Sequence, residues 1–119
     1  MLARARRVSE MRNHYTFRFD EDKAYEDQLA SVFEASPEHP LSAPEAPRQP
    51  GVYVLFRGCV PVYVGKAKDL RSRLKDYLKR AASRQGINVQ EVTCRFVTIE
   101  RMWEVLRAKA ALRRRYNLE

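Results

Sequence analysis

The clearest hydrophobic pattern lies in the middle of the chain, where two short apolar runs flank a glycine. The run VYVLF, which begins at Val52, predicts a β-strand, and Gly58 predicts a tight turn after it. In the second run, valines at positions 60, 62 and 64 alternate with Pro61, Tyr63 and Gly65, so we expect the valines on one face and Tyr63 on the other. Pro61 indicates a sheet edge or a bulge. The two runs therefore predict a β-hairpin.

After the hairpin, the pattern changes to the period of an amphipathic helix. Asp69 begins this helix, and its apolar face is formed by Leu70, Leu74, Tyr77, Leu78 and Ala81. Residues 83–88 are polar and include Gly86, which predicts a loop. Residues 93–99, TCRFVTI, are rich in β-branched side chains and predict a third strand. A last helix is expected from about 100 to 115.

The first fifty residues predict additions to this core. Aromatic residues at 15, 17 and 19 alternate, which predicts a short strand or an extended arm. A helix with an acidic first turn is expected from Asp20 to about 35, and its apolar stripe is formed by Tyr25, Leu29, Val32 and Phe33. Five prolines between 36 and 50 exclude a helix there and predict a semi-rigid connector, either a linker or a segment that wraps the core.

We therefore expect an α+β fold in three parts. Residues 51–119 are predicted to form a small domain with a three-stranded antiparallel sheet flanked by helices. Residues 1–35 are predicted to form an N-terminal arm and helix, and residues 36–50 a proline-rich connector.

Composition supports one ordinary folded domain. The chain has 119 residues, of which 45% are hydrophobic and 32% charged. No apolar run approaches the roughly 20 residues of a membrane span, and the first ten residues lack the apolar segment of a secretory signal. Cys59 and Cys94 predict buried, reduced thiols in a cytoplasmic protein rather than a disulfide. His14 and His39 are not at metal-binding spacing.

The net charge of +8 is concentrated in the second part of the chain. Residues 1–51 contain 7 Lys/Arg and 9 Asp/Glu, whereas residues 52–119 contain 16 Lys/Arg and 6 Asp/Glu. A basic domain attracts polyanions, so we expect a nucleic acid as partner, and no membrane. The three arginines that end the last helix would equally complement its C-terminal dipole. The candidate backbone-binding cations are Lys66, Lys68, Arg71, Lys75, Arg113, Arg114 and Arg115.

The hairpin and the next helix carry a pattern suited to a phosphodiester. Tyr53 and Tyr63 are ten positions apart, and Arg73 lies ten beyond Tyr63. A tyrosine with a pKa near ~10 is a poor base unless a cation or a metal lowers that value, and Lys66 is placed to do so. Arg73 can offer a bidentate fork to a phosphate. The alternatives are ordinary strand aromatics and an Arg73–Asp69 pair on the helix surface.

These residues resemble a known family. The triplets GVY at 51–53 and YVG at 63–65 look like the two signatures of the GIY-YIG nuclease superfamily, and the following KAKDLRSRL is similar to the UvrC-type nuclease domain. The resemblance covers roughly residues 50–119 and implies a Mg²⁺-dependent DNA endonuclease. The extension before residue 51 looks more like the restriction-endonuclease branch. The implied site residues are Tyr53 and Tyr63, with Tyr63 as base or water-positioner, Lys66 and Arg73 as phosphate ligands, and Tyr77 beside them.

The superfamily also implies a metal-binding glutamate on the last helix, in a pattern L-x-x-E-A-x-L-I, with an asparagine twelve residues later. The matching text here is LRAKAAL, with Lys109 at the position of the glutamate, and Asn117 falls eight residues later. An ammonium cannot ligate Mg²⁺. Three hypotheses follow: an impaired nuclease, a nucleic-acid-binding module without catalysis, or a carboxylate supplied by Glu104 or Glu100. The third is the weakest, because Glu104 is rotated by about 140° from Lys109. A homodimer is compatible with all three.

Overall fold

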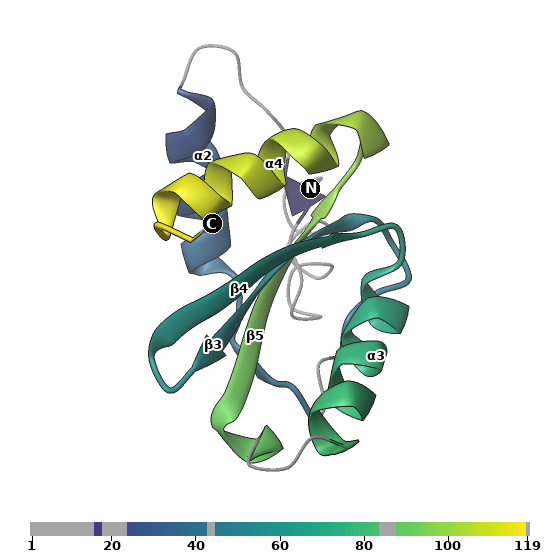
Figure 1. The fold of residues 1–119 in the computed structure, drawn as a ribbon. Helices are drawn as coiled ribbons and strands as arrows, with labels where there is room; N and C mark the ends of the chain where they lie inside the picture. The colour runs from purple at the N-terminus through teal and green to yellow at the C-terminus, as the bar shows by residue number, and fades with distance from the viewer. Residues whose placement is uncertain (1–15, 18–23, 43–44, 84–87, 119) are drawn as a thin grey trace, which may run out of the picture.

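The computed structural model describes residues 16–17, 24–42, 45–83 and 88–118. Figure 1 shows a central sheet with helices on both of its faces. In chain order the elements are β1 (Thr16–Phe17), α2 (Tyr25–Ala35), β2 (His39–Pro40), β3 (Gly51–Arg57), β4 (Val60–Ala67), α3 (Leu70–Ser83), the 3-10 turn η1 (Val89–Glu91), β5 (Val92–Ile99) and α4 (Met102–Arg115). His14, the predicted helix start at Asp20, and Gly86 lie outside the described residues.

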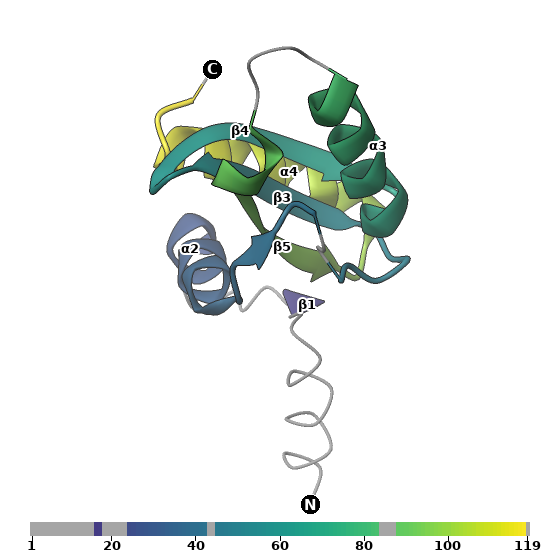
Figure 2. The same ribbon diagram turned by 90° about the horizontal axis from the view of Figure 1, so that it is seen from below.

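The sheet has β3 at its centre, paired in antiparallel fashion with β4 on one side and β5 on the other. The two-residue strands β1 and β2 both pair with β5, β1 in parallel and β2 antiparallel. Figure 2 shows the order from β4 through β3 and β5 to β1. The expected α+β fold is confirmed, and two short strands from the N-terminal part extend the expected three. None of the described helices has the length and apolar character that a membrane span requires.

β3 is covered on both faces, as its uninterrupted apolar sequence indicates. Val52, Val54 and Phe56 belong to a core cluster with α2 and α4. Tyr53 and Leu55 point the other way, into a second cluster under α3. Strand alternation thus divides the molecule into three layers, with the sheet between α3 and the α2–α4 pair.

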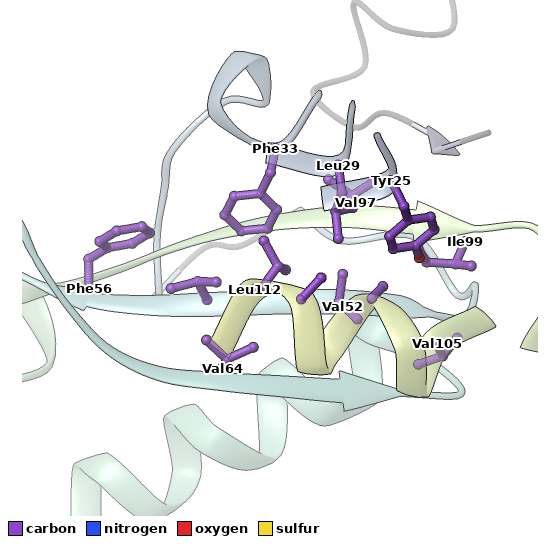
Figure 3. Close-up of a cluster of buried hydrophobic side chains, with 13 residues drawn as sticks. Tyr25, Leu29, Phe33, Val52, Phe56, Val64, Val97, Ile99, Val105 and Leu112 are labelled. Carbon is purple, nitrogen blue, oxygen red and sulfur yellow. The ribbon is translucent and has the colours of Figure 1, made fainter. Parts of the chain in front are cut away.

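The larger core lies between the sheet and the α2–α4 pair. Figure 3 shows Leu29 and Phe33 of α2 and Leu112 of α4, which belong to this core cluster. Leu29 and Phe33 are fully buried, as the apolar stripe in the sequence predicts. The helix ends before Ser36, whose N–H donates to the carbonyl of Phe33 at 3.1 Å. Further members of this core are Tyr25, Val64, Val97, Ile99, Val105, Ala108 and Ala111.

The proline-rich segment packs along the core and is not a free linker. Its β2 residues pair with β5, and Leu41 and Ala46 are buried under α3. Hydrogen bonds tie it to the start of that helix. The N–H of Leu70 donates to the Gln49 carbonyl at 3.0 Å, the N–H of Arg71 donates to the Pro47 carbonyl at 3.2 Å, and Nε of Arg71 donates to the Ala46 carbonyl at 2.9 Å. The segment therefore holds the N-terminal end of α3, beside the paired residues Gly51 and Ala67 and at the end of the hairpin opposite the Gly58 turn.

A β-bulge changes the expected faces of β4. The register with β3 shifts so that Tyr63 and Pro61 face consecutive β3 residues, which leaves Val62 as the extra residue. Val64 is buried in the α2–α4 core, but Val60 and Val62 are 61% and 48% exposed. The prediction that the three valines share one face is therefore wrong, because a bulge breaks strand alternation. The expected edge position and irregularity at Pro61 are confirmed.

The two cysteines have different environments. Cys94 is buried in β5, and burial raises the pKa of its thiol to about 12. Cys59 is exposed in the hairpin turn, where it follows Gly58, whose φ of 66° is left-handed. The prediction of two buried thiols is wrong for Cys59, because a two-residue turn projects from the sheet. Both thiols are free.

Candidate functional site

Three tyrosines from three elements meet on the α3 face of the sheet: Tyr53 of β3, Tyr63 of β4 and Tyr77 of α3. Their ring centroids are 6.1 Å (Tyr53–Tyr63), 6.0 Å (Tyr53–Tyr77) and 5.4 Å (Tyr63–Tyr77) apart. Tyr63 pairs with Leu55, so it is a diagonal neighbour of Tyr53 on one face. Tyr53 is buried, Tyr77 half-buried and Tyr63 40% exposed. We call these three residues the tyrosine cluster.

Gly65 makes the position of the Tyr53 ring possible. Gly65 pairs directly with Tyr53, and a Cβ atom on Gly65 would overlap ring atoms Cζ, Oη and Cε1 of Tyr53. The ring of the first triplet therefore lies across the glycine of the second triplet. Sequence reasoning missed this role, because nothing along the chain shows which residue a ring covers.

The buried phenols of the cluster stay protonated at neutral pH. Burial, and then the neighbouring phenols of Tyr63 and Tyr77, raise the pKa of Tyr53 well above its ordinary value. Burial, and then the neighbouring Tyr63 phenol, raise the pKa of Tyr77 to about 12. The opposing charge of Arg73 is the smaller effect in both cases. Tyr53 and Tyr77 can therefore donate hydrogen bonds through their hydroxyl groups.

These raised values predict a loss of stability at alkaline pH. Because Tyr77 ionises near pH 10 when unfolded and near 12 when folded, its contribution is complete below pH 10 and is lost as the pH rises toward 12. We expect the melting temperature to fall across this range and to fall less steeply in Tyr77→Phe, which has no ionisable hydroxyl. Circular dichroism melts between pH 9 and 12 measure this. Equal slopes for the two proteins would contradict it.

A pocket of about 440 Å³ lies where the end of β4, the start of α3 and the start of α4 meet. It contains both predicted phosphate ligands, Lys66 and Arg73, and also Lys68. Arg73 lies close enough to the tyrosine cluster for its charge to act on the Tyr53 and Tyr77 phenols. We call this pocket the basic pocket. Its lining residues are Lys66, Ala67, Lys68, Asp69, Ser72, Arg73, Asp76, Val105 and Leu106.

The carboxylate of Asp69 interacts with Ser72 and Arg48 and not with Arg73. Its Oδ1 accepts the Ser72 N–H at 3.1 Å, and its Oδ2 pairs with Arg48 at 3.0 Å. The hydrogen bond from the Ser72 backbone is the main cause that lowers the pKa of Asp69. The alternative of an Arg73–Asp69 pair is therefore wrong. Within the described ranges Arg73 has no ion pair, so its guanidinium is available to an anionic ligand.

The last helix brings no free carboxylate to this pocket. Glu104 is 8% exposed and lies near Tyr25 of α2, whose pKa its charge helps to raise. Since it does not line the basic pocket, the hypothesis that Glu104 supplies the missing ligand is not supported. Lys109 is half-buried and lies one helical turn beyond the pocket residues Val105 and Leu106.

The ligands for a metal ion are sparse in this arrangement. Among residues 16–17, 24–42, 45–83 and 88–118, no three His, Cys, Asp or Glu side chains form a group that could hold an ion. The carboxylates that line the basic pocket are those of Asp69, which is paired with Arg48, and Asp76. Three cationic side chains line the same pocket. The residues present do not fit the cation that the resemblance implies at the last helix.

The remaining predicted cations are divided between two regions. Lys68 lines the basic pocket and Lys75 is exposed on α3, whereas Arg71 donates to the connector. At the other end of α4, Arg114 pairs with Glu26 at 3.4 Å and Arg115 with Glu34 at 3.6 Å, so these arginines join α4 to α2. Arg113 and Asn117 line a separate hollow there, and the φ of Asn117 is 56°. The structure thus does not bring Asn117 to the tyrosine cluster.

Comparison with known proteins identifies a family for this fold. A family model described as the UvrC-like GIY-YIG domain matches residues 49–115, more than half of the chain. The UvrABC system protein C of Thermus thermophilus is 36% identical over 69 residues, which is 58% of this chain and 12% of that protein. The same protein of Deinococcus radiodurans is 50% identical over 36 residues, which is 30% of this chain and 6% of that protein. The chain thus spans only a small part of these relatives.

Solved structures of the GIY-YIG N-terminal endonuclease domain of UvrC from Thermotoga maritima are also similar. An asparagine-to-alanine point mutant bound to its catalytic divalent cation has a TM-score of 0.51 and 30% identity, over 61% of this chain and 82% of that one. The magnesium-bound domain has a TM-score of 0.49 and 32% identity, over 61% and 83%. With the matched region spanning both tyrosine triplets and the helix that follows, this chain belongs to the family of UvrC-like GIY-YIG domains.

Proposed function

We propose that this domain binds a DNA phosphodiester at the tyrosine cluster and the basic pocket, as a GIY-YIG endonuclease whose Mg²⁺-dependent hydrolysis is impaired by Lys109. One observation carries the proposal: Arg73, which has no ion pair within the described residues, lies beside three clustered phenols in a pocket with two lysines. A planar guanidinium offers two parallel hydrogen bonds to a phosphate.

The other residues have roles that follow from their exposure and protonation. Lys66 supplies a second positive charge on the phosphate. Tyr63, the most exposed of the cluster, is the one that reaches a water molecule in solvent. Tyr53 and Tyr77, which burial keeps neutral, act as hydrogen-bond donors to phosphate oxygens or to Tyr63.

Lys109 is the reason to expect impaired hydrolysis. The related Thermotoga maritima domain is bound to its catalytic divalent cation. In this chain the ammonium group of Lys109 stands where the family pattern has a carboxylate. No carboxylate of α4 lines the basic pocket. A divalent ion would therefore meet repulsion from Lys109 in place of a ligand.

The same observation favours a second candidate, a DNA-binding module without catalysis. Both candidates require the phosphodiester site, and they differ only in whether a bound strand is cut. DNA as partner and the basic surface are common to both. The restriction-endonuclease branch, a cytoplasmic location and a homodimer stay predictions, since the relatives described above are UvrC proteins and a single chain is described.

The phosphodiester site is tested by replacing Arg73. We expect Arg73→Ala to weaken binding to a fluorescent DNA duplex by about tenfold or more, because a hydrogen bond to a charged group contributes roughly 1.5–3 kcal/mol. Arg73→Lys should be intermediate, since it keeps the charge but loses the fork. Fluorescence anisotropy at several salt concentrations measures this.

Lys79→Ala is the matched control, because Lys79 is an exposed cation on the same helix that does not line the basic pocket. This variant should change the affinity for DNA by less than about twofold. The slope of log affinity against log salt should fall by no more than the contribution of one phosphate contact. Equal losses in Arg73→Ala and Lys79→Ala would mean that DNA is held only by diffuse charge. Absence of DNA binding in the unaltered protein would overturn the proposal.

A further inference from the structure

A second pocket, of about 300 Å³, adjoins the tyrosine cluster on the side away from the basic pocket. The two pockets share no lining residue, but Tyr77 belongs both to the tyrosine cluster and to the wall of this second pocket. We call it the apolar pocket. Its lining includes Leu41, Leu55, Val62, Tyr77, Arg57 and Arg80.

The inside of this pocket is hydrophobic although it is open to solvent. Leu41 and Leu55 are buried and form its base, while Val62 is 48% exposed at its wall. Val62 is there because of the β-bulge, which turns it to the α3 side of the sheet, away from Val64. An open apolar hollow beside a polar site is a typical binding place for the apolar part of a ligand.

The rim of the pocket is positively charged. Arg57 and Arg80 are both exposed, and in the described part of the chain the guanidinium group of neither forms a hydrogen bond or an ion pair. The charge of Arg80 acts on the Tyr77 phenol, so this guanidinium lies near the ring. The occupant that fits must be flat or compact and apolar at its centre and anionic at its edge.

We propose that the apolar pocket receives an unpaired nucleobase of the DNA strand whose phosphate lies at the tyrosine cluster. A nucleobase has the apolar faces that stack on a tyrosine ring, and its flanking phosphates suit Arg57 and Arg80. The base must be unpaired because a base inside a duplex is stacked and cannot enter a pocket. The inference rests on the proposed function and adds a preference for DNA that contains an unpaired nucleotide.

The experiment compares three labelled DNAs of one sequence: a full duplex, a duplex with one unpaired nucleotide, and the same with an abasic residue at that place. We expect the protein to bind the unpaired base about tenfold more tightly than the abasic residue, because a stacked base contributes about 1–3 kcal/mol. Val62→Asp should abolish this difference, and it should weaken binding of the full duplex no more than Val60→Asp, which adds the same charge to β4.

Val60→Asp is the matched control, because Val60 is also exposed on β4 but does not line the apolar pocket. It should keep the tenfold preference. Arg80→Ala is a second variant, and it should reduce the preference more than Lys79→Ala does. Equal binding of base and abasic DNA by the unaltered protein would overturn this inference and leave the proposed function standing. A preference that persists in Val62→Asp and Arg80→Ala would place the base elsewhere, and absence of all DNA binding would overturn both proposals.

Discussion

Lys109→Glu is expected to raise Mg²⁺-dependent cleavage of plasmid DNA by about a hundredfold or more over the unaltered chain. The substitution removes an ammonium one turn beyond the basic pocket and supplies the carboxylate that the family pattern has at this position. Preorganised charges of this kind contribute about 10²–10³ in rate. The measurement is the rate of plasmid nicking with and without Mg²⁺, read from gels.

Two controls separate ligation from electrostatics. Lys109→Gln removes the positive charge without adding a ligand, so it should restore little activity. Arg101→Glu makes the same change of charge at an exposed residue before α4 that does not line the basic pocket, and it should restore none. If Lys109→Glu binds DNA but does not cut it, the chain is a binding module. Cleavage by the unaltered chain that Glu104→Ala abolishes would contradict the assignment of Lys109.

Gly65→Ala is expected to lower the free energy of unfolding by about 2–3 kcal/mol and to displace the Tyr53 ring. The new methyl group would overlap three atoms of that ring. The ring cannot move aside easily, because it is buried and has Tyr63 and Tyr77 as neighbours. Since the ring is part of the tyrosine cluster, DNA binding should weaken together with stability. Urea unfolding followed by circular dichroism measures the stability change.

Gly58→Ala is the control for the backbone alone, because Gly58 has a left-handed φ of 66° and no atom within 4 Å of an added Cβ. It should cost about 1 kcal/mol. The pairing with Tyr53 is tested in Tyr53→Leu, which removes the ring. In that background Gly65→Ala should cost clearly less than in the unaltered protein. An equal cost in both backgrounds would mean that Gly65 is needed for another reason.

The sequence by itself determined the fold class and the main elements of the site. The run from Val52 and the glycine turn at Gly58 predict the hairpin, because strand alternation and turn geometry depend on neighbouring residues. The same locality explains the buried leucines of α3 and the apolar stripe of α2. The ten-residue spacings predict that Tyr53, Tyr63 and Arg73 converge, since a hairpin followed by a helix returns the chain to one face of the sheet.

Only the tertiary structure decided which neighbours these residues have. The bulge turns Val62 into the apolar pocket, and the ring of Tyr53 makes Gly65 necessary. Arg48, which lies 21 residues before Asp69, donates a hydrogen bond to the Asp69 carboxylate, although the helix spacing suggested Arg73 as its partner. Glu104 faces Tyr25, so it leaves the basic pocket without a carboxylate from α4. The physical reason is common to all four: each depends on contacts between separate helices, strands or loops, and the periodicity within one segment contains no information about those contacts.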